Sequence, residues 1–320
     1  MERKAFESVL GAMGHTPMVR LDRLAGKWGL EGTLYGKLEY LNPGFSKKDR
    51  IALRMIQEAE ESGDLKPGQP VVELTSGNTG TGLAIVCGVT GHPFCAVMSR
   101  GNSMERARMM KALGAEVVLV DQAPGSVPGQ VSGEDLALVE ARARRIVEER
   151  RAYRADQFIL GGNPRAHEFG TGEEIWEQTG GDVDAFVDFA GTGGSFVGCA
   201  RALKKHNPAI RCYLLEPDTA AWLAGKAVTN PGHKIQGGGY SRDLPILEEG
   251  LVEDYLSVSS EEAMEGARTL AKTEGIFAGY SSGANAMGAA ELLRGREKGG
   301  SVVFLVCDSG LKYLSTDLYV

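Results

Sequence analysis

The sequence lacks several features that would assign the protein to a membrane, a nucleic acid or a secretory route. None of its 320 residues form a run near the roughly 18 consecutive apolar residues that a membrane-spanning helix needs. The N-terminal segment MERKAFESVLGAMG has no signal-peptide core or cleavage site. Asp and Glu (42) outnumber Lys and Arg (35), and the net charge of −7 disfavours a nucleic-acid partner. We expect a cytoplasmic protein with no membrane contact.

Cysteine and histidine are scarce and are not spaced as metal ligands. There are five of each, with no CxxC, HxxxH or HxxE pattern, so we predict no metal site. The cysteines lie mostly in apolar runs, which is typical of buried, reduced thiols. The arginine-rich stretch that begins at Glu140 alternates Arg with Glu at helical spacing, which favours a solvated helix face.

Apolar runs of strand length alternate with helical patterns along most of the chain. We expect strands at 70–75, 93–99, 115–120, 184–190, 210–216 and 301–307. Helical patterns follow several of them, in TGLAIVCGV, NSMERARMMKALG and FVGCARALKKH. This alternation predicts an α/β fold with parallel-rich open sheets that helices cover on both faces, and the length suggests two domains or one large unit.

The segment 121–135, DQAPGSVPGQVSGED, interrupts the alternation. Its Pro, Gly and Ser residues predict a loop that is longer than the usual connection between such elements. A lid and a plain surface excursion fit this segment equally well.

Two glycine-rich segments follow predicted strands, TSGNTGTG at 75–82 and AGTGGS at 190–195. Free backbone N–H groups at such strand-to-helix turns can bind an anion, although glycines also serve simply to make tight turns. Neither segment contains the lysine of a nucleotide P-loop, and Phe196 stands where a dinucleotide fingerprint needs its third glycine. A smaller phosphate-bearing cofactor remains.

Two adjacent lysines, Lys47 and Lys48, lie in NPGFSKKDRIALRM at the start of a helical pattern. A helix start needs no paired lysines, which suggests that one of them is a reagent. A free lysine amine is almost wholly protonated at pH 7, and burial or a Schiff base removes that obstacle. A phosphate cradle with a reactive lysine suggests pyridoxal 5'-phosphate.

Seven motifs in order make the chain resemble a known family. They are LEYLNPGFSKKDRIA, TSGNTGTGLA, MERARMMKALGAEVVLV, TGEEIWEQTGG, GTGGS, HKIQG and EGIFAGYSSGA. The chain is similar over nearly its whole length to the cysteine synthase (O-acetylserine sulfhydrylase) and cystathionine β-synthase family of fold type II pyridoxal-phosphate enzymes, which are tryptophan synthase β-like.

The resemblance also implies a domain organisation. It places the cofactor in a cleft between two domains and implies a homodimer. The N-terminal portion, 1–152, would include a smaller mobile domain at about 40–152 with the lysine and the substrate loop. Residues 153–320 would form a larger domain with the phosphate loop.

The resemblance assigns roles residue by residue. Lys48 would be the Schiff-base lysine and general base, and Lys47 would be an exposed helix-start charge. Ser281 would face the pyridine nitrogen, which a serine cannot hold protonated as an aspartate does; this favours β-elimination chemistry over transamination. Asn78 would bind the 3′-oxygen. The phosphate would be bound by Gly191, Thr192, Gly193, Gly194 and Ser195. The amino-acid substrate would contact Thr75, Ser76, Thr79, Gln157, Gly237 and Tyr240.

The implied reaction is β-replacement on an activated L-serine, first of all O-acetyl-L-serine with sulfide to give L-cysteine and acetate. Condensation of serine with homocysteine, and β-elimination from cysteine or serine, are the alternatives. The departures from the family pattern, Tyr240 and Leu160-Gly161 among them, gather at the expected substrate mouth. For His15, which also departs from the pattern, we expect a structural role.

Overall fold

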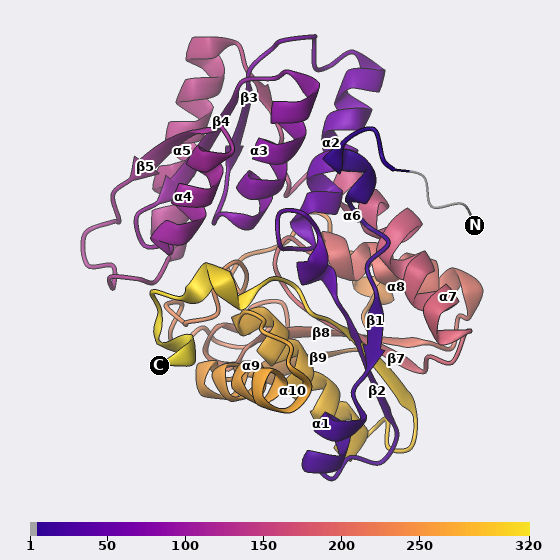
Figure 1. The fold of residues 1–320 in the computed structure, drawn as a ribbon. Coiled ribbons are helices and arrows are strands. Elements are labelled where there is room, and N and C mark those ends of the chain that lie inside the picture. Colours follow the sequence, from indigo (N-terminus) through magenta and orange to yellow (C-terminus); the bar gives the residue numbers. More distant parts are fainter. Residues whose placement is uncertain (1–4) are drawn as a thin grey trace.

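A computed structural model describes residues 5–320, and within that range the chain forms two β-sheets with flanking helices (Figure 1). The smaller sheet is all parallel and has the order β5-β4-β3-β6. The larger sheet has the order β1-β2-β10-β7-β8-β9, in which β1 alone runs antiparallel to its neighbour. The predicted α/β fold with parallel-rich sheets is confirmed.

The bounds of the elements are as follows. The strands are β1 Met18–Arg20, β2 Thr33–Lys37, β3 Val71–Leu74, β4 Phe94–Ser99, β5 Glu116–Val120, β6 Tyr153–Arg154, β7 Ala185–Phe189, β8 Arg211–Pro217, β9 Asp254–Val258 and β10 Ser301–Leu305. The α-helices are α1 Asp22–Lys27, α2 Lys48–Ser62, α3 Asn78–Thr90, α4 Met104–Ala112, α5 Gly133–Arg150, α6 Gly162–Ala166, α7 Glu173–Thr179, α8 Gly194–His206, α9 Ser260–Glu274 and α10 Tyr280–Arg294. Short 3-10 turns are η1 Val9–Ala12, η2 Glu39–Leu41, η4 Asp218–Ala220, η5 Glu249–Leu251, η6 Gly310–Tyr313 and η7 Asp317–Tyr319, and η3 His167–Gly172 is a π-helical turn.

All six strands that the sequence predicts are present, each within about two residues of its expected bounds. The prediction did not include β1, β2, β6 and β9, which are short or carry polar residues. Strand β2 pairs with β10, from Thr33 beside Ser301 to Lys37 beside Leu305. The two ends of the chain therefore build the same sheet, which local sequence patterns do not reveal.

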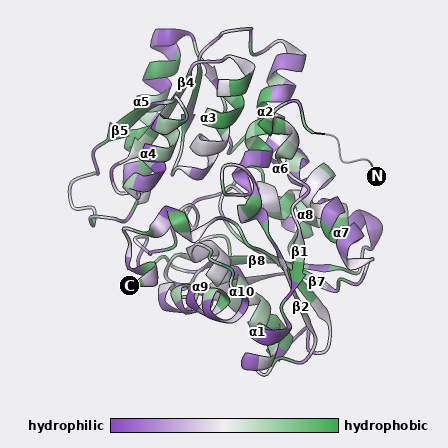
Figure 2. Ribbon diagram, in the orientation of Figure 1, coloured by the Kyte–Doolittle hydropathy of each residue, from purple (hydrophilic) through white to green (hydrophobic). Residues whose placement is uncertain are grey.

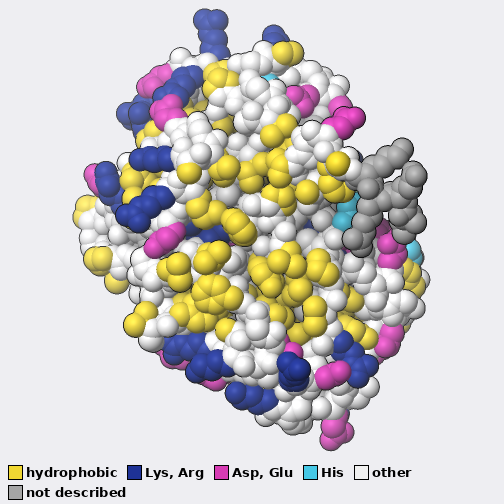
Figure 3. Space-filling model, viewed as in Figure 1, with side chains coloured by type: hydrophobic (Ala, Val, Ile, Leu, Met, Phe, Trp, Pro, Cys, Tyr) yellow, Lys and Arg dark blue, Asp and Glu magenta, His cyan; other side chains and the backbone are white. Residues whose placement is uncertain are grey.

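Hydrophobic residues are frequent in the strands and in the helices beside them (Figure 2), and their side chains form buried clusters in both sheet units. Helix α3 is buried from Thr79 to Cys87 because it packs between the small sheet and α2. All five cysteines are free and buried, as predicted. On the face shown in Figure 3, hydrophobic side chains gather across the middle and charged ones lie toward the rim.

The loop after β5 is shorter than predicted at its C-terminal end. Helix α5 begins at Gly133 because Ser132 caps it, with a capping box to Asp135. The predicted solvated face on this helix is confirmed, since Arg144 and Arg145 are exposed. Helices of the described range include none long and apolar enough to cross a membrane.

Candidate active site

The site forms where the start of α2, the loops after β3 and β7, and the chain after β10 meet. The N–H of Lys47 donates to the carbonyl of Cys307 at 2.9 Å, and Ser46 forms a β-bridge with Asp308. Asp308 in turn accepts a 2.8 Å hydrogen bond from the side chain of Asn78 in the first glycine-rich loop. Segments that lie far apart in the sequence thus meet at the start of α2, next to Lys48.

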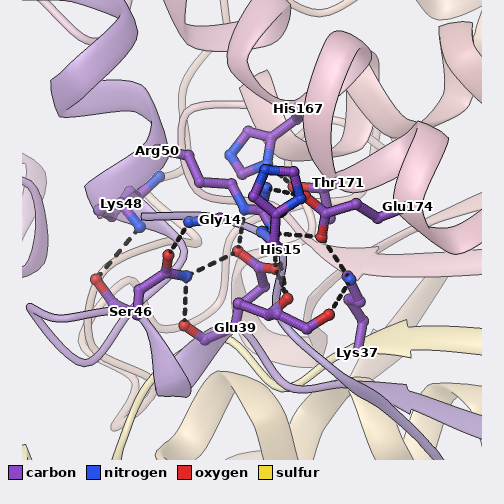
Figure 4. A network of polar contacts seen from close by, with 12 residues as sticks. Gly14, His15, Lys37, Glu39, Ser46, Lys48, Arg50, His167, Thr171 and Glu174 are labelled. Atoms are coloured by element: carbon purple, nitrogen blue, oxygen red, sulfur yellow. Dashed lines mark hydrogen bonds and ion pairs between the residues drawn. The ribbon is translucent and has the colours of Figure 1, made fainter. Parts of the chain in front are cut away.

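Lys48 is the first residue of α2 and is 8% exposed. Burial and then the positive charge of Lys47 lower the pKa of the Lys48 amine to about 8. Its backbone N–H donates to the hydroxyl of Ser46 at 3.3 Å, which is the contact drawn in Figure 4. A neutral amine is therefore accessible near neutral pH at this position, as a nucleophile or base requires.

A buried ionic network anchors the first turn of α2 (Figure 4). Arg50 donates to both oxygens of Glu39 at 2.7 and 2.8 Å and to both oxygens of Glu174 at 2.7 Å. Lys37 donates to Glu174 at 2.6 Å. Because Lys37 lies on β2 and Glu174 on α7, the network fixes the Lys48 end of α2 against the larger sheet.

Burial alone would raise the pKa of Glu174, but hydrogen bonds and charge from Arg50 and Lys37 outweigh it and lower that pKa to about 2. His15 takes a structural position at the edge of the network, as expected. Its backbone N–H donates to Glu174 at 3.0 Å, and its φ of 48° is left-handed.

The expectation that Lys47 is an exposed charge is wrong. Lys47 is 7% exposed, and its amine lies 2.9 and 2.8 Å from the two oxygens of Asp188 on β7. Burial opposes its charge, but the carboxylate of Asp188 outweighs burial and holds the pKa of Lys47 above its ordinary value. The helix start lies inside the molecule because Lys47 contacts Asp188 on β7 and the backbone of Cys307 after β10.

The loop 190–195 has the form of an anion cradle. It leads into α8, whose N-cap Gly193 has φ 85° and provides no side-chain cap. The first N–H groups of this 13-residue helix are thus left for a ligand. Thr192 accepts a 2.8 Å hydrogen bond from Asn163, while the hydroxyl of Ser195 donates to Asp188 at 2.5 Å. The predicted phosphate-binding residues therefore lie together at the turn from β7 into α8. The hydroxyl of Ser195 points back to Asp188 on β7.

The loop 75–79 is organised differently. The hydroxyl oxygen of Thr75 accepts from the N–H groups of Gly77 and Gly80 at 2.9 and 3.0 Å and so caps α3. Thr79 donates to Gln157 at 2.6 Å. The Gln157 amide donates to Glu73 and to the carbonyl of Leu74, both at 3.1 Å. Of the side chains for which the resemblance implies contact with the substrate, Thr79 and Gln157 are thus hydrogen-bonded to each other.

The remaining predicted residues line the same region. Asn78 accepts a 2.7 Å hydrogen bond from Lys312 in addition to its contact with Asp308. A side chain at Gly191 would meet the carbonyl of Gly237 at 3.2 Å, so that these two loops touch. Ser281 is half-buried in the first turn of α10.

Tyr240 connects the two halves of the site. Its hydroxyl lies 3.4 Å from that of Ser76, and its ring packs edge-on against Phe158 with centroids 5.9 Å apart. Tyr240 also lines a cavity of about 510 Å³ together with residues 124–126 and 132–134. The segment after β5 therefore lies close to Tyr240.

Sequence reasoning missed Asp188, Asp308, Lys312 and Asn163 as members of the site. For Asp188 a signal existed, since it is an acidic residue in the otherwise apolar run AFVDF. Among residues 5–320, no group of three or more His, Cys, Asp or Glu side chains could hold a metal ion.

These residues fit pyridoxal phosphate. An uncapped helix N-terminus behind a Gly-Thr-Gly-Gly turn suits a phosphate, and a buried amine with a lowered pKa suits the aldehyde. Asn78 and Ser281 add uncharged polar groups from two further elements. Lys48 and the loop 190–195 would hold the cofactor.

Comparison with known proteins agrees with this geometry. The family described as "Pyridoxal-phosphate dependent enzyme" matches residues 9–308. A cysteine synthase of Staphylococcus aureus is 39% identical, over 100% of this chain and 99% of its own length. An O-acetylserine sulfhydrylase of Entamoeba histolytica has the same fold with a TM-score of 0.90 and 33% identity, over 100% of this chain and 93% of its own.

A hydrogen sulfide-producing enzyme of Fusobacterium nucleatum is also similar, with a TM-score of 0.88 and 36% identity over 97% of this chain and 100% of its own. The family match and the similar proteins cover almost the whole sequence, and the geometry of the site fits the cofactor that the family name states. The chain belongs to the family of pyridoxal-phosphate-dependent enzymes.

Proposed function

We propose that the protein catalyses β-replacement on O-acetyl-L-serine with sulfide, giving L-cysteine and acetate. The observation that carries this proposal is the place of Lys48, a buried lysine at the start of α2 where contacts through Asp308 and Asp188 bring in the glycine-rich segments after β3 and β7. The likeness to a cysteine synthase and an O-acetylserine sulfhydrylase supports the choice of substrates.

Pyridoxal phosphate, when bound, withdraws electrons from the α-carbon of an amino acid and so makes its proton acidic. Nζ of Lys48 accepts that proton in our proposal, and it can do so because its pKa is low. Acetate leaves the β-carbon with its bonding electrons, sulfide forms the new C–S bond there, and Lys48 returns the proton to the α-carbon.

We propose that the loop 75–79 binds the substrate carboxylate through its N–H groups and the hydroxyls of Thr75 and Ser76. The Thr75 oxygen already accepts two backbone hydrogen bonds, so its hydrogen is available to a carboxylate. Thr79 and Gln157 would exchange their mutual hydrogen bond for the substrate. Tyr240, beside Ser76, would help to exclude water and to select the second substrate.

Two other reactions use the same residues. Condensation of serine with homocysteine is supported by Tyr240, whose ring and hydroxyl could bind a thiol larger than sulfide. Elimination from cysteine with release of sulfide is supported by the likeness to the Fusobacterium nucleatum enzyme. We rank both below the reaction of O-acetyl-L-serine with sulfide because the similarity to a cysteine synthase extends over 100% of this chain.

The test is to supply the purified holoenzyme with O-acetylserine, O-phosphoserine, serine or cysteine, each followed by sulfide or homocysteine. We expect O-acetylserine with sulfide to give the highest kcat/KM, with cysteine and acetate in equal amounts. Faster condensation of serine with homocysteine, or pyruvate and ammonia as the main products, would refute the proposal.

A second test concerns the lysine pair. Lys48→Ala should lose the absorption of the lysine-bound cofactor and at least about 1,000-fold in kcat, since nucleophile and base are removed together. Lys47→Arg, which keeps the charge beside Asp188, is the matched control and should retain both. Loss of lysine-bound cofactor in Lys47→Arg but not in Lys48→Ala would reverse the assignment.

We further propose a cytoplasmic homodimer in which residues of about 40–152 move relative to the rest. Resemblance to the family supports the dimer and the motion, and the five unpaired buried cysteines suit a reducing compartment. Light scattering of the purified protein tests the dimer, and a mass of about one 34.1 kDa chain would exclude it.

A further inference from the structure

Asp188 is a charged residue on the apolar strand β7 (Ala185–Phe189), and its side chain is fully buried. One oxygen accepts hydrogen bonds from Lys47 at 2.9 Å and from Asn285 at 3.1 Å. The other accepts from Lys47 at 2.8 Å and from Ser195 at 2.5 Å. The carboxylate is thus fully satisfied, and its position is fixed by α10 and by the loop 190–195 as well as by the lysine.

These contacts connect the two parts of the site that would hold the cofactor. Ser195 is the last residue of the proposed phosphate loop, and Lys47 precedes Lys48. The backbone N–H of Lys47 donates to the carbonyl of Cys307 at 2.9 Å, which fixes the chain just before α2. Both the charge of Lys47 and the direction of Ser195 therefore depend on Asp188.

A buried ion pair is a poor device for stability alone. The cost of removing two charges from water commonly equals or exceeds their attraction, and apolar residues of similar volume often serve as well. The core around β7 is otherwise apolar, with Phe186, Val187 and Phe189 buried. The pair's presence beside Lys48 is better explained by an electrostatic role.

We propose that Lys47 and Asp188 are a positioning pair that keeps a fixed positive charge beside the amine of Lys48. This inference rests on the proposed role of Lys48. The pair acts through Lys48 and does not need to touch the substrate.

The other titratable and charged groups near Lys48 do not supply this charge. Cys307 follows β10 and is a buried thiol whose pKa burial raises to about 12. His167 lies on η3 and is held neutral, since burial and nearby cations lower its pKa. Arg50, one turn along α2, is held by Glu39 and Glu174. Among these groups Lys47 is the one whose charge most favours a neutral Lys48 amine, and Asp188 partly opposes it.

The experiment measures Lys48 directly on the full-length chain after removal of cofactor. Pyridoxal phosphate is added at different pH values, and the rate of its capture is followed by absorbance. Capture needs a neutral amine, so the midpoint of the rate against pH reports the pKa of Lys48; Lys48→Ala provides the blank. This readout does not depend on which amino acid is the substrate, so it can fail without the proposed function failing, and the reverse.

We compare the wild type with three variants. Lys47→Arg should keep the midpoint near that of the wild type. Asp188→Asn removes the counter-ion that keeps the buried Lys47 charged, so Lys47 loses its proton and the midpoint should rise above that of the wild type. The double variant Lys47→Met/Asp188→Asn removes both charges and should raise the midpoint above that of the wild type.

Coincident midpoints in all four proteins, or a midpoint of Asp188→Asn or of the double variant below that of the wild type, would overturn the proposal. Asp188→Asn leaves Lys47 buried without its counter-ion and could fail to fold. In that case the double variant decides the question by itself: a raised midpoint supports the proposal, and an unchanged or lowered one overturns it.

Discussion

The site contains two similar units, β3–loop–α3 and β7–loop–α8. They have the same order of elements, but their helix N-termini differ. Each is an apolar strand that ends in a glycine-rich turn before a helix of 13 residues. Each strand also carries one fully buried acid, Glu73 or Asp188, paired with a cation, Arg154 or Lys47.

The units differ in what occupies the N-terminus of the helix. In the first unit Thr75 caps α3 and the acid, Glu73, supports Gln157, so the loop offers arranged side chains. In the second unit no side chain caps α8, so the loop offers backbone N–H groups. An uncapped helix N-terminus suits the phosphate of a cofactor that stays bound, because its free N–H groups can donate to the phosphate oxygens. A capped N-terminus with nearby hydroxyls suits the carboxylate of a substrate that binds and leaves in each turnover.

The cations differ in location as well. Arg154 lies at the edge of the small sheet, where it also pairs with Glu140 on α5. Lys47 is buried beside Lys48 at the start of α2. The same acid-and-cation arrangement thus lies beside the proposed substrate loop in one unit and beside Lys48, the proposed reactive lysine, in the other.

Glu174 supports both units, because its network anchors the start of α2 between them. Glu174→Gln should cost about 3–5 kcal/mol of unfolding free energy, since Arg50 and Lys37 lose a buried counter-charge. The measurement is urea unfolding, with exposed Glu177→Gln on the same helix as the control. Equal stability of the two variants would contradict the importance of the network.

The pH dependence of stability sharpens the same point. The folded pKa of Glu174 is lowered to about 2, below the value of about 4.3 for an unfolded glutamate. Its contribution is therefore present above about pH 4.3 and is lost as the pH falls toward 2. Unfolding curves across that window should show a smaller loss of stability in Glu174→Gln than in the wild type.

Gly194→Ala should damage the phosphate unit alone. A β-carbon there would lie 2.0 Å from Asn163 Oδ1, so Asn163 would have to give up its hydrogen bond to Thr192. We expect the dissociation constant of pyridoxal phosphate to rise about 100-fold, or ~2.7 kcal/mol. Gly26→Ala, where no atom lies within 4 Å of the added carbon, is the control and should leave cofactor binding intact.

Gly77→Ala should damage the substrate unit far more than the phosphate unit. Its φ of 123° favours glycine, and a β-carbon would lie 2.4 Å from Arg106 Cδ. We expect the KM for O-acetylserine to rise about 10-fold or more while the cofactor content stays full, because the lysine and the loop 190–195 are untouched. Loss of cofactor in this variant would show that the two units are not separable.

Tyr240→Phe should have the smallest effect. It removes a hydroxyl 3.4 Å from that of Ser76, a long hydrogen bond, and keeps the ring against Phe158. We expect the KM for O-acetylserine to change by about two- to five-fold, in line with a net ~0.5–1 kcal/mol for such a bond. Tyr240→Ala should change the KM of the second substrate more than that of the first.

Much of the fold and site could be predicted from the sequence because the signals were local. Strand-length apolar runs gave β3, β4, β5, β7, β8 and β10, and the motif around Lys48 together with two glycine-rich segments indicated the site. Strands β1 and β2 escaped prediction because they are short, and their place in the large sheet depends on pairing with β10 from the other end of the chain. The roles of the individual site residues stay predictions until the variants are measured.

The sequence by itself determined the α/β alternation, the lysine, the two glycine-rich turns and the family, since each is written in contiguous residues. Only the tertiary structure decided the environment of each group. A helix-start lysine would ordinarily be solvated, but folding placed Lys47 against Asp188, 141 positions away, and buried both. Burial lowers the pKa of Lys48 most, and both this burial and the Asp188 carboxylate that pairs with the adjacent Lys47 come from segments that meet only in the folded chain.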